Sequence, residues 1–302
     1  MPAFPLVAGV ELGGTKCVAT LSSGPGDIRE RIRIDTTDPE TTLGALADIV
    51  VRWRRSSGFD AIGIACFGPL VLDRGRADYG SISRTTKPGW NDARVLERLC
   101  GPHPVPCGFQ TDVNGAVLAE GLWGGARGLA DHAYVTIGTG VGVGVVADHR
   151  LLLKSAHMEL GHMRIPRLAG DSFAGSCAYH GDCVEGLLSG AAIRARHGRH
   201  GFDLPADHPY WAQFCDEAAA FLHGLIVGVW PRRIAIGGGV LSTRGELLPR
   251  IADRVRESLG GYGAAGDPAY LHADFIGPPH LGSEAGPLGA IALGLMALDI
   301  RQ

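Results

Sequence analysis

The sequence predicts an α/β protein with two domains, and three observations support this prediction. Short apolar runs bounded by glycine and proline are typical of buried strands. Between them lie segments with the apolar period of an amphipathic helix. Finally, 302 residues exceed what one hydrophobic core usually fills, so two domains or one large unit of two lobes are expected.

The predicted strands alternate with helices, which is typical of the α/β class. The strand-like runs are residues 6–12, 17–23, 61–67, 105–111, 133–138, 141–147 and 232–238. Apolar residues recur at helical spacing from Leu43 to Val50 and again from Phe214 to Leu225. Both segments are predicted to be helices that bury one face.

The composition excludes several classes of protein. With 28 Lys and Arg against 31 Asp and Glu, the net charge is −3, so the chain lacks the basic field of a nucleic-acid-binding protein. The start "MPAFPLVAGV" has no basic segment, and no apolar run approaches the roughly 18 residues of a membrane span. We therefore expect a cytoplasmic protein. The seven cysteines are an odd number, which favours reduced thiols over a disulfide framework.

Two segments share one pattern. "GVELGGTKCVAT" (9–20) and "YVTIGTGVGVGVV" (134–146) each place a turn rich in glycine and threonine between two apolar strands. We expect two β-hairpins, one per lobe, that face each other across a cleft. Glycine lets backbone N–H groups approach phosphate oxygens, while Thr15 and Thr139 add hydroxyls and Lys16 adds a positive charge. An ordinary tight hairpin remains an alternative for either turn alone.

Two further motifs follow predicted strands. "IGGGV" (236–240) would let a flat group such as a purine pack against the backbone, although a plain glycine-rich turn also explains it. In "FQTDVNGAVLAEG" (109–121), Asp112 ends a strand and Asn114 lies near the start of the next helix. Because ligands gather at the carboxyl ends of strands, Asp112 is placed to act as a general base. Alternatively, Asp112 merely caps the helix.

A third group of residues has the spacing of a metal site. In "CAYHGDC", Cys177, His180 and Cys183 are each separated by two residues, and His162 precedes them in "ELGHM". Two sulfur and two nitrogen ligands form the closed tetrahedral set that structural zinc prefers. Glu159 and Glu185 lie next to these residues in the sequence, so a bound metal would also fix the positions of their carboxylates. Carboxylates in fixed positions suit a polyhydroxylated ligand.

The remaining histidines and cysteines carry no predicted role. "RHGRH" (196–200) is expected to be a solvated basic turn, and His157 and His223 are expected to pack or to lie on the surface. Five cysteines lie in apolar or loop segments, where a small buried side chain is the simplest interpretation, namely Cys17, Cys66, Cys100, Cys107 and Cys215.

Taken together, these motifs resemble the ROK family of repressors, uncharacterised reading frames and sugar kinases, and in particular its bacterial fructokinases. The resemblance covers residues 7–298 and rests on "ELGGTK", "GIACFGP", "YGSISRTTKPGW", "TDVNGA", "IGTGVGVG", "MELGHM", "CAYHGDCVEGLLSG" and "IGGGV". It implies the two-lobed actin-like ATPase or sugar-kinase fold, which is ribonuclease H-like. Residues 1–112, joined by a C-terminal helix 288–302, would form the N-terminal lobe, and residues 113–287 the C-terminal lobe with the zinc loop.

The resemblance also implies roles for single residues. Asp112 would deprotonate the sugar hydroxyl. The sugar would be held by Gly68, Asn114, Glu159, His162 and Glu185, and a structural zinc by His162, Cys177, His180 and Cys183. ATP and Mg²⁺ would be bound by Glu11, Gly13, Gly14, Thr15, Lys16, Thr139 and Gly140. The nucleotide pocket would be lined by Gly190, Gly237, Gly238 and Gly239.

Three positions depart from the family pattern. Glu11 stands where most members have Asp, a change that the fructokinase-like members share. Thr111 replaces a common Asn, which would weaken one sugar contact. His180 replaces a cysteine, a change that zinc accepts.

The implied activity is transfer of the γ-phosphoryl group of Mg·ATP to the 6-hydroxyl of D-fructose by a homodimer. The loop "YGSISRTTKPGW" would decide between fructose, mannose and glucose, so mannokinase or glucokinase activity is an alternative. A sugar-sensing regulator without catalysis is another. Repressors of the family carry a DNA-binding segment before the phosphate loop, and the few residues before "ELGGTK" leave no room for one.

Overall fold

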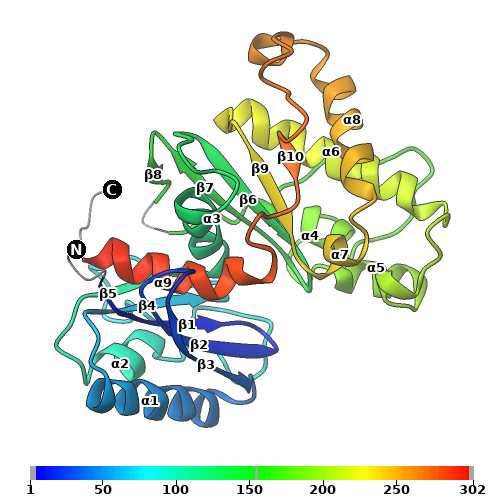
Figure 1. The fold of residues 1–302 in the computed structure, drawn as a ribbon. Helices are drawn as coiled ribbons and strands as arrows, with labels where there is room; N and C mark the ends of the chain where they lie inside the picture. The colour runs from blue at the N-terminus through cyan, green and yellow to red at the C-terminus, as the bar shows by residue number, and fades with distance from the viewer. Residues whose placement is uncertain (1–4, 154–155, 299–302) are drawn as a thin grey trace. The chain divides into compact units, whose positions relative to one another are not determined.

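The computed structural model describes residues 5–153 and 156–298. The chain divides into two compact units (Figure 1), of which unit 1 comprises residues 1–127, 153–158 and 283–302, and unit 2 comprises residues 128–152 and 159–282. Each unit contains a five-stranded sheet with helices, which confirms the predicted α/β class. The contacts place the first unit boundary after residue 127, so the helix after Asp112 belongs to unit 1, whereas the expected boundary followed residue 112.

Unit 1 is built on a mixed sheet with the strand order β3-β2-β1-β4-β5. Strands β1, β4 and β5 run parallel, and β2 and β3 are antiparallel to their neighbours. The strands are β1 (Val7–Leu12), β2 (Lys16–Ser22), β3 (Ile28–Asp35), β4 (Ala61–Cys66) and β5 (Cys107–Thr111). The helices are α1 (Pro39–Ser56), α2 (Val95–Cys100), α3 (Asp112–Trp123) and α9 (Ala285–Ala297).

Strand β3 was not expected from the sequence. Its segment "IRERIRID" alternates one inward residue with one exposed residue, as an edge strand does. The inward Glu30 accepts a 2.7 Å hydrogen bond from Nε1 of Trp53, a fully buried residue of α1. Helix α1 itself begins after Asp38, whose carboxylate caps the N–H of Thr41 at 2.9 Å.

Helix α9 packs against a row of glycines on the sheet. Gly9, Gly63 and Gly108 are paired neighbours on β1, β4 and β5. A Cβ atom on Gly63 would overlap the carbonyl oxygen of Ala290 in α9, and one on Gly9 would stand 2.7 Å from Ile291 Cδ1. Because the row has no side chains, the helix backbone lies directly on the strands. The expected extension of this helix to residue 302 includes residues 299–302, which lie outside the described residues.

Unit 2 is built on a second mixed sheet with the strand order β10-β9-β6-β7-β8. Its strands are β6 (His132–Ile137), β7 (Val141–Ala147), β8 (Arg150–Leu151), β9 (Ile234–Gly237) and β10 (Ile276–Gly277). Its α-helices are α4 (Val184–Leu188), α5 (Gly190–His197), α6 (Tyr210–Val229), α7 (Gly239–Thr243) and α8 (Leu247–Leu259). Short 3₁₀ turns are η1 (Leu160–His162), η2 (Gly201–Asp203) and η3 (Gly263–Gly266), while η4 (Gly282–Glu284) leads into α9.

The two helices predicted from apolar periodicity correspond to α1 and α6. Helix α6 buries Phe214, Phe221, Leu222 and Leu225 and packs on α8. Within the part of the chain that the structure describes, no helix has both the length and the apolar character needed to cross a bilayer.

Candidate active site and metal centre

The candidate catalytic residues of unit 1 follow the ends of three parallel strands. Leu12 of β1 is level with Cys66 of β4, and Cys66 is level with Thr111 of β5. The residues that follow, among them Gly13, Gly68 and Asp112, therefore leave the sheet at one edge. Ligands of open α/β sheets bind at such carboxyl ends, so the fold of unit 1 brings the phosphate-loop candidate and the base candidate to one place.

The alternative that Asp112 caps helix α3 is wrong. The N-cap is Thr111, whose hydroxyl accepts a hydrogen bond from the N–H of Asn114 at 3.3 Å. Thr111 therefore has a structural task that the asparagine common in the family would share. Asp112 is the first helical residue, and its carboxylate accepts the N–H of Val113 at 2.9 Å. Asn114 is buried and its amide donates to Gln110 at 3.1 Å.

Glu11 lies in β1 next to this edge. Burial and, to a smaller extent, the nearby charge of Asp112 raise the pKa of Glu11 to about 7, against the lowering effect of Lys16 and Arg31. A Cβ atom on Gly286 would overlap the Glu11 carboxylate, so this glycine makes room for it. Two carboxylates whose charges act on each other in this way form a donor set that suits a hard divalent cation such as Mg²⁺.

The first predicted hairpin is present between β1 and β2. Its turn is closed by a 3.1 Å hydrogen bond from the N–H of Gly13 to the carbonyl of Lys16. Thr36 supports the turn from the end of β3 by donating its hydroxyl to the Gly13 carbonyl at 2.7 Å. A Cβ on Gly14 would have nothing within 4 Å, so the tip of the turn is open to a ligand.

Lys87 also contacts this turn, although the sequence motifs gave it no role. Its Nζ, from the loop "RTTKPGW", donates to the carbonyl of Gly14 at 2.7 Å. The composition of the chain could have indicated Lys87, because only three of its 28 Lys and Arg residues are lysine. Two of these three are Lys16, which lies in the hairpin, and Lys87, which contacts it.

The second predicted hairpin is present between β6 and β7 in unit 2. Glu185, 44 residues further along the chain, contacts this hairpin. Its carboxylate accepts a hydrogen bond from the N–H of Val141 at 3.1 Å and would lie only 2.5 Å from a Cβ on Gly140. The N–H of Gly190, at the start of α5, donates to the carbonyl of Gly138 at 2.7 Å. The hairpin is thus held by helices α4 and α5 through contacts that only glycine permits.

The triple glycine after β9 lies against the same hairpin. A Cβ on Gly138 would stand 3.6 Å from the backbone nitrogen of Gly239. Gly238 has φ = +92°, which favours glycine, and a Cβ on Gly237 would overlap the hydroxyl of Tyr134. A Cβ on Gly239 would have no neighbour within 4 Å. In unit 2 the hairpin, Gly190 and the triple glycine therefore lie together, and among residues 237–239 Gly239 is the exposed one. Glycine backbone of this kind suits a nucleotide.

The four predicted zinc ligands converge in unit 2. One ligand atom from each of His162, Cys177, His180 and Cys183 lies within 4.8 Å of all the others. Nδ1 of His162 is 3.6 Å from the sulfur of Cys177, 3.5 Å from that of Cys183 and 3.2 Å from Nδ1 of His180. The sulfur of Cys177 is 3.7 Å from Nδ1 of His180.

These distances fit a tetrahedral zinc site. Zn–S bonds of about 2.3 Å and Zn–N bonds of about 2.0 Å give tetrahedral edges of roughly 3.6 Å between S and N and roughly 3.3 Å between two N atoms. The observed S–N edges of 3.5, 3.6 and 3.7 Å and the N–N edge of 3.2 Å agree with them. The side chains are therefore arranged for a closed, structural ion.

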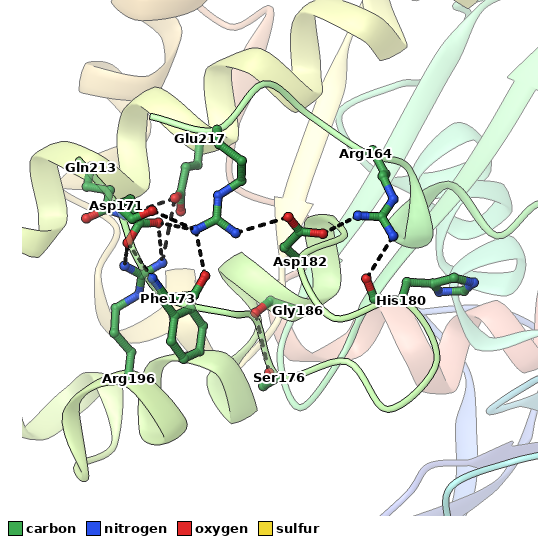
Figure 2. Close-up of polar contacts among 11 residues, drawn as sticks. Arg164, Asp171, Phe173, Ser176, His180, Asp182, Gly186, Arg196, Gln213 and Glu217 are labelled. Atoms are coloured by element: carbon green, nitrogen blue, oxygen red, sulfur yellow. Dashed lines mark hydrogen bonds and ion pairs between the residues drawn. The ribbon is translucent and has the colours of Figure 1, made fainter. Parts of the chain in front are cut away.

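An ion-pair network holds the segment that carries these ligands (Figure 2). Arg164 donates to Asp182 and, at 3.1 Å, to the carbonyl of His180. Arg167 joins Asp182 at 3.3 Å to Asp171 at 2.7 Å. Asp182 lies between the candidate ligands His180 and Cys183 in the sequence. Its ion pairs with Arg164 and Arg167 therefore fix the backbone of the loop that carries these ligands.

The prediction of a solvated turn at 196–200 is wrong for Arg196. Its side chain is only 10% exposed, binds Asp171 through both terminal nitrogens at 2.7 and 3.1 Å, and lies 3.7 Å from the buried Glu217. The Arg196 guanidinium, as Figure 2 shows, lies with Asp171 between α5 and α6, and it holds the pKa of Asp171 at about 2. Helix α5 continues through His197, which directs Arg196 inwards.

Comparisons with known proteins agree with these features. The ROK family profile matches residues 7–296. A protein named fructokinase from Pediococcus pentosaceus is 38% identical over 97% of this chain and 99% of its own length. A fructokinase from Zymomonas mobilis is 37% identical over 95% of this chain and 96% of its own.

Solved structures show the same fold. A ROK hexokinase from Thermus thermophilus superposes with a TM-score of 0.78 at 28% identity, over 97% of this chain and 99% of that one. A ROK family glucokinase from Streptomyces griseus, solved with glucose and AMPPNP, gives 0.71 at 22% identity over 96% of this chain and 99% of its own. The match across almost the whole sequence, together with the actin-like fold of two α/β units, shows that the chain belongs to the ROK family.

Proposed function

We propose that the protein is an ATP-dependent fructokinase that transfers the γ-phosphoryl group of Mg·ATP to the 6-hydroxyl of D-fructose. The observation that carries the proposal is the placement of Asp112 and the glycine hairpin 13–15 at one edge of the unit 1 sheet. The choice of fructose is supported by the relatives named fructokinase, which match the chain over nearly its full length.

In the proposed reaction, Asp112 is the general base. Its carboxylate accepts the proton of the sugar hydroxyl while that oxygen forms a bond to the γ-phosphorus. The bond from the γ-phosphorus to the bridging oxygen breaks, and ADP leaves with the electron pair. This chemistry depends mainly on positioning and on neutralising the phosphate charge. Backbone N–H groups of Gly14 and Thr15, with the Thr15 hydroxyl and Lys16, would stabilise the transferred group.

The remaining candidates divide between two tasks. Gly68 and Asn114 of unit 1 and Glu159, His162 and Glu185 of unit 2 would orient the sugar. Thr139, Gly140, Gly190 and residues 237–239 would bind the nucleotide, because the glycines let a flat group approach the peptide plane closely.

The two metal ions have different roles. Mg²⁺ enters with ATP as part of the substrate, and Glu11 would face it; when bound, it would neutralise charge on the phosphates. A zinc ion held by His162, Cys177, His180 and Cys183 would be structural, since four protein ligands leave no open position. A homodimer also belongs to the proposal, on the resemblance to the family.

A coupled assay for ADP release tests this function. Fructose, mannose, glucose and N-acetylmannosamine would be compared at equal concentrations with ATP, in the presence and in the absence of Mg²⁺. We expect kcat/KM for fructose to exceed that for each other sugar by at least about tenfold, a difference of roughly 1.4 kcal/mol in transition-state binding. Equal rates for several hexoses would identify a general hexokinase, and no sugar-dependent ADP release would reject the kinase function.

A further inference from the structure

The chain uses lysine so rarely that its lysines are informative. Lysine and arginine together number 28, of which 25 are arginine and three are lysine, namely Lys16, Lys87 and Lys154. Lys154 lies outside the described residues. Lys16 begins β2 directly after the hairpin turn, and Lys87 donates to that turn from a loop 73 residues further on.

The two cations are interchangeable only at some positions. On an exposed surface lysine and arginine both provide a solvated positive charge. A guanidinium, however, is a planar group with donors in a fixed arrangement, whereas an ammonium is a compact charge with three rotatable donors. A chain that prefers arginine so strongly retains lysine where the compact charge is needed. A tight turn that binds a tetrahedral phosphoryl group is such a position, as phosphate-binding lysines illustrate.

The loop holds Lys87 in place. Trp90, which is fully buried, donates its Nε1 to the carbonyl of Thr37 at 2.8 Å, and its backbone N–H donates to the carbonyl of Lys87 at 3.3 Å. The N–H of Thr85 donates to Asn91 at 2.8 Å. These bonds fix the backbone on both sides of Lys87, so its side chain reaches the hairpin from an anchored base.

The ammonium has donors to spare. It donates to the Gly14 carbonyl at 2.7 Å, and Lys87 forms no ion pair with any residue that the structure describes. An ammonium carries three N–H groups, so two of them stay available for another acceptor. The neighbouring Gly14 has open space within 4 Å of its Cβ position. A charged donor that is not paired with any described carboxylate thus lies beside an open, glycine-rich turn.

We propose that Lys87 is a catalytic residue that binds the γ-phosphoryl group during transfer. The assignment rests on the proposed kinase function and extends it to a residue of the loop 81–90. Lys87 keeps its proton throughout, while the hydroxyl proton goes to Asp112 and the electron pair of the broken P–O bond leaves with ADP. Its task is to neutralise charge on the transferred group and to join the loop to the phosphate hairpin.

Two variants test this assignment by a readout other than activity. ADP lacks the γ-phosphoryl group, whereas AMPPNP carries its analogue, so calorimetric affinities for both would be measured for Lys87→Met and Lys87→Arg. We expect Lys87→Met to weaken AMPPNP binding by about 10- to 100-fold, the value of a charge-assisted hydrogen bond, and to change ADP binding less than about threefold. Lys87→Arg should restore only part of the AMPPNP affinity, because it keeps the positive charge but replaces the compact ammonium with a planar guanidinium.

Kinetics complete the test. We expect kcat of Lys87→Met to fall by about 100-fold, as for the loss of one transition-state donor, with the sugar KM nearly unchanged. Arg55→Met, which removes an exposed cation of α1 outside every proposed site, is the control and should behave as wild type. If Lys87→Met does not fold, Lys87→Gln takes its place.

The opposite results are equally clear. Equal weakening of ADP and AMPPNP would show that Lys87 only supports the hairpin, and an unchanged kcat would show that it has no part in transfer. Either outcome overturns the assignment while an active wild-type enzyme upholds the proposed function. A wild-type protein that transfers no phosphate to any sugar, yet discriminates AMPPNP from ADP through Lys87, would reject the function and retain the γ-phosphoryl site.

Discussion

Nε2 of His162 lies 3.9 Å from the Glu159 carboxylate, while Nδ1 of the same ring lies 3.5 and 3.6 Å from the sulfurs of Cys183 and Cys177. One imidazole thus connects the metal cluster to a candidate sugar ligand. A carboxylate partner on the free nitrogen of a metal-bound histidine orients the ring. The connection predicts that the metal and sugar affinity are linked.

Removal of zinc should therefore affect the sugar more than the nucleotide. We expect the purified protein to contain about one zinc ion per chain. Chelation should raise the sugar KM by roughly tenfold or more, because His162 and its partner Glu159 lose the orientation that the metal gives them. The KM for ATP should change less. Metal analysis and steady-state kinetics before and after chelation give the measurement.

Cysteine variants control for nonspecific effects. Cys177→Ser should lose zinc and show the same raised sugar KM as the chelated enzyme. Cys107→Ser, at a half-buried cysteine outside the cluster, should keep its zinc and the wild-type sugar KM. Full zinc content in Cys177→Ser would contradict the assigned ligand set.

Asp112→Asn should remove the base and leave the architecture intact. Thr111, not Asp112, caps helix α3, so the amide does not disturb the helix start. We expect kcat to fall by about 10²- to 10⁴-fold, the usual contribution of general base catalysis, and sugar affinity measured by calorimetry to stay within about threefold. A variant with normal turnover would refute the role of Asp112.

Glu11 should make the ligand-free protein less stable as the pH rises. Burial and Asp112 raise its folded-state pKa from 4.5 to about 7, so the folded protein holds this proton more tightly than the unfolded chain. The stabilisation is complete below pH 4.5 and is lost as the pH rises through 7. The total loss would be about 3 kcal/mol.

The Glu11→Gln side chain cannot ionise, so this variant should not lose stability through residue 11 as the pH rises. Urea denaturation between pH 4 and pH 8, without nucleotide or Mg²⁺, should show a variant that is about 2 to 3 kcal/mol more stable than wild type at pH 8 and nearly equal to it at pH 4. Glu97→Gln, at an exposed position of α2, should retain the wild-type pH dependence. If the free energy of unfolding had the same pH dependence in Glu11→Gln and in wild type, the raised pKa of Glu11 would not be the cause of the loss of stability.

Gly63→Ala should destabilise unit 1 through a single methyl group. The new Cβ would overlap the Ala290 carbonyl, so α9 must move away from the sheet. We expect the free energy of unfolding to fall by about 1 to 3 kcal/mol or more. Gly26→Ala is the matched control, because its Cβ would have no neighbour within 4 Å, and it should change stability by less than about 0.5 kcal/mol. Equal melting temperatures would show that α9 tolerates the methyl group.

Arg196→Ala should destabilise unit 2, because it removes the cation that lies 3.7 Å from the buried Glu217 and leaves Asp171 with Arg167 alone. Breaking a buried ion pair costs about 3 to 5 kcal/mol. Arg199→Ala, at an exposed position of the same sequence turn, should be nearly neutral. Chemical denaturation of both variants measures the difference, and similar unfolding free energies for the two would restore the interpretation of a solvated turn.

Much of the fold could be predicted because burial leaves a strong local pattern. Strands β1, β4, β6 and β7 are apolar along most of their length, and α1 and α6 repeat their apolar residues at helical spacing. Strand β3 was missed because an edge strand buries only alternate residues and carries charges on the others. Arg196 was misplaced because nothing in "RHGRH" shows which side of the helix meets Asp171.

The amino-acid sequence by itself determined the α/β class, the two glycine hairpins, the family and the four residues of the candidate metal cluster, because each depends on residue type and on spacing along the chain. Only the tertiary structure decided that Arg196 is buried, that α9 rests on the glycine row of β1, β4 and β5, and that Lys87 reaches the Gly14 carbonyl. These are contacts between residues far apart in sequence, and their geometry follows from strand register and helix packing, which no local pattern encodes.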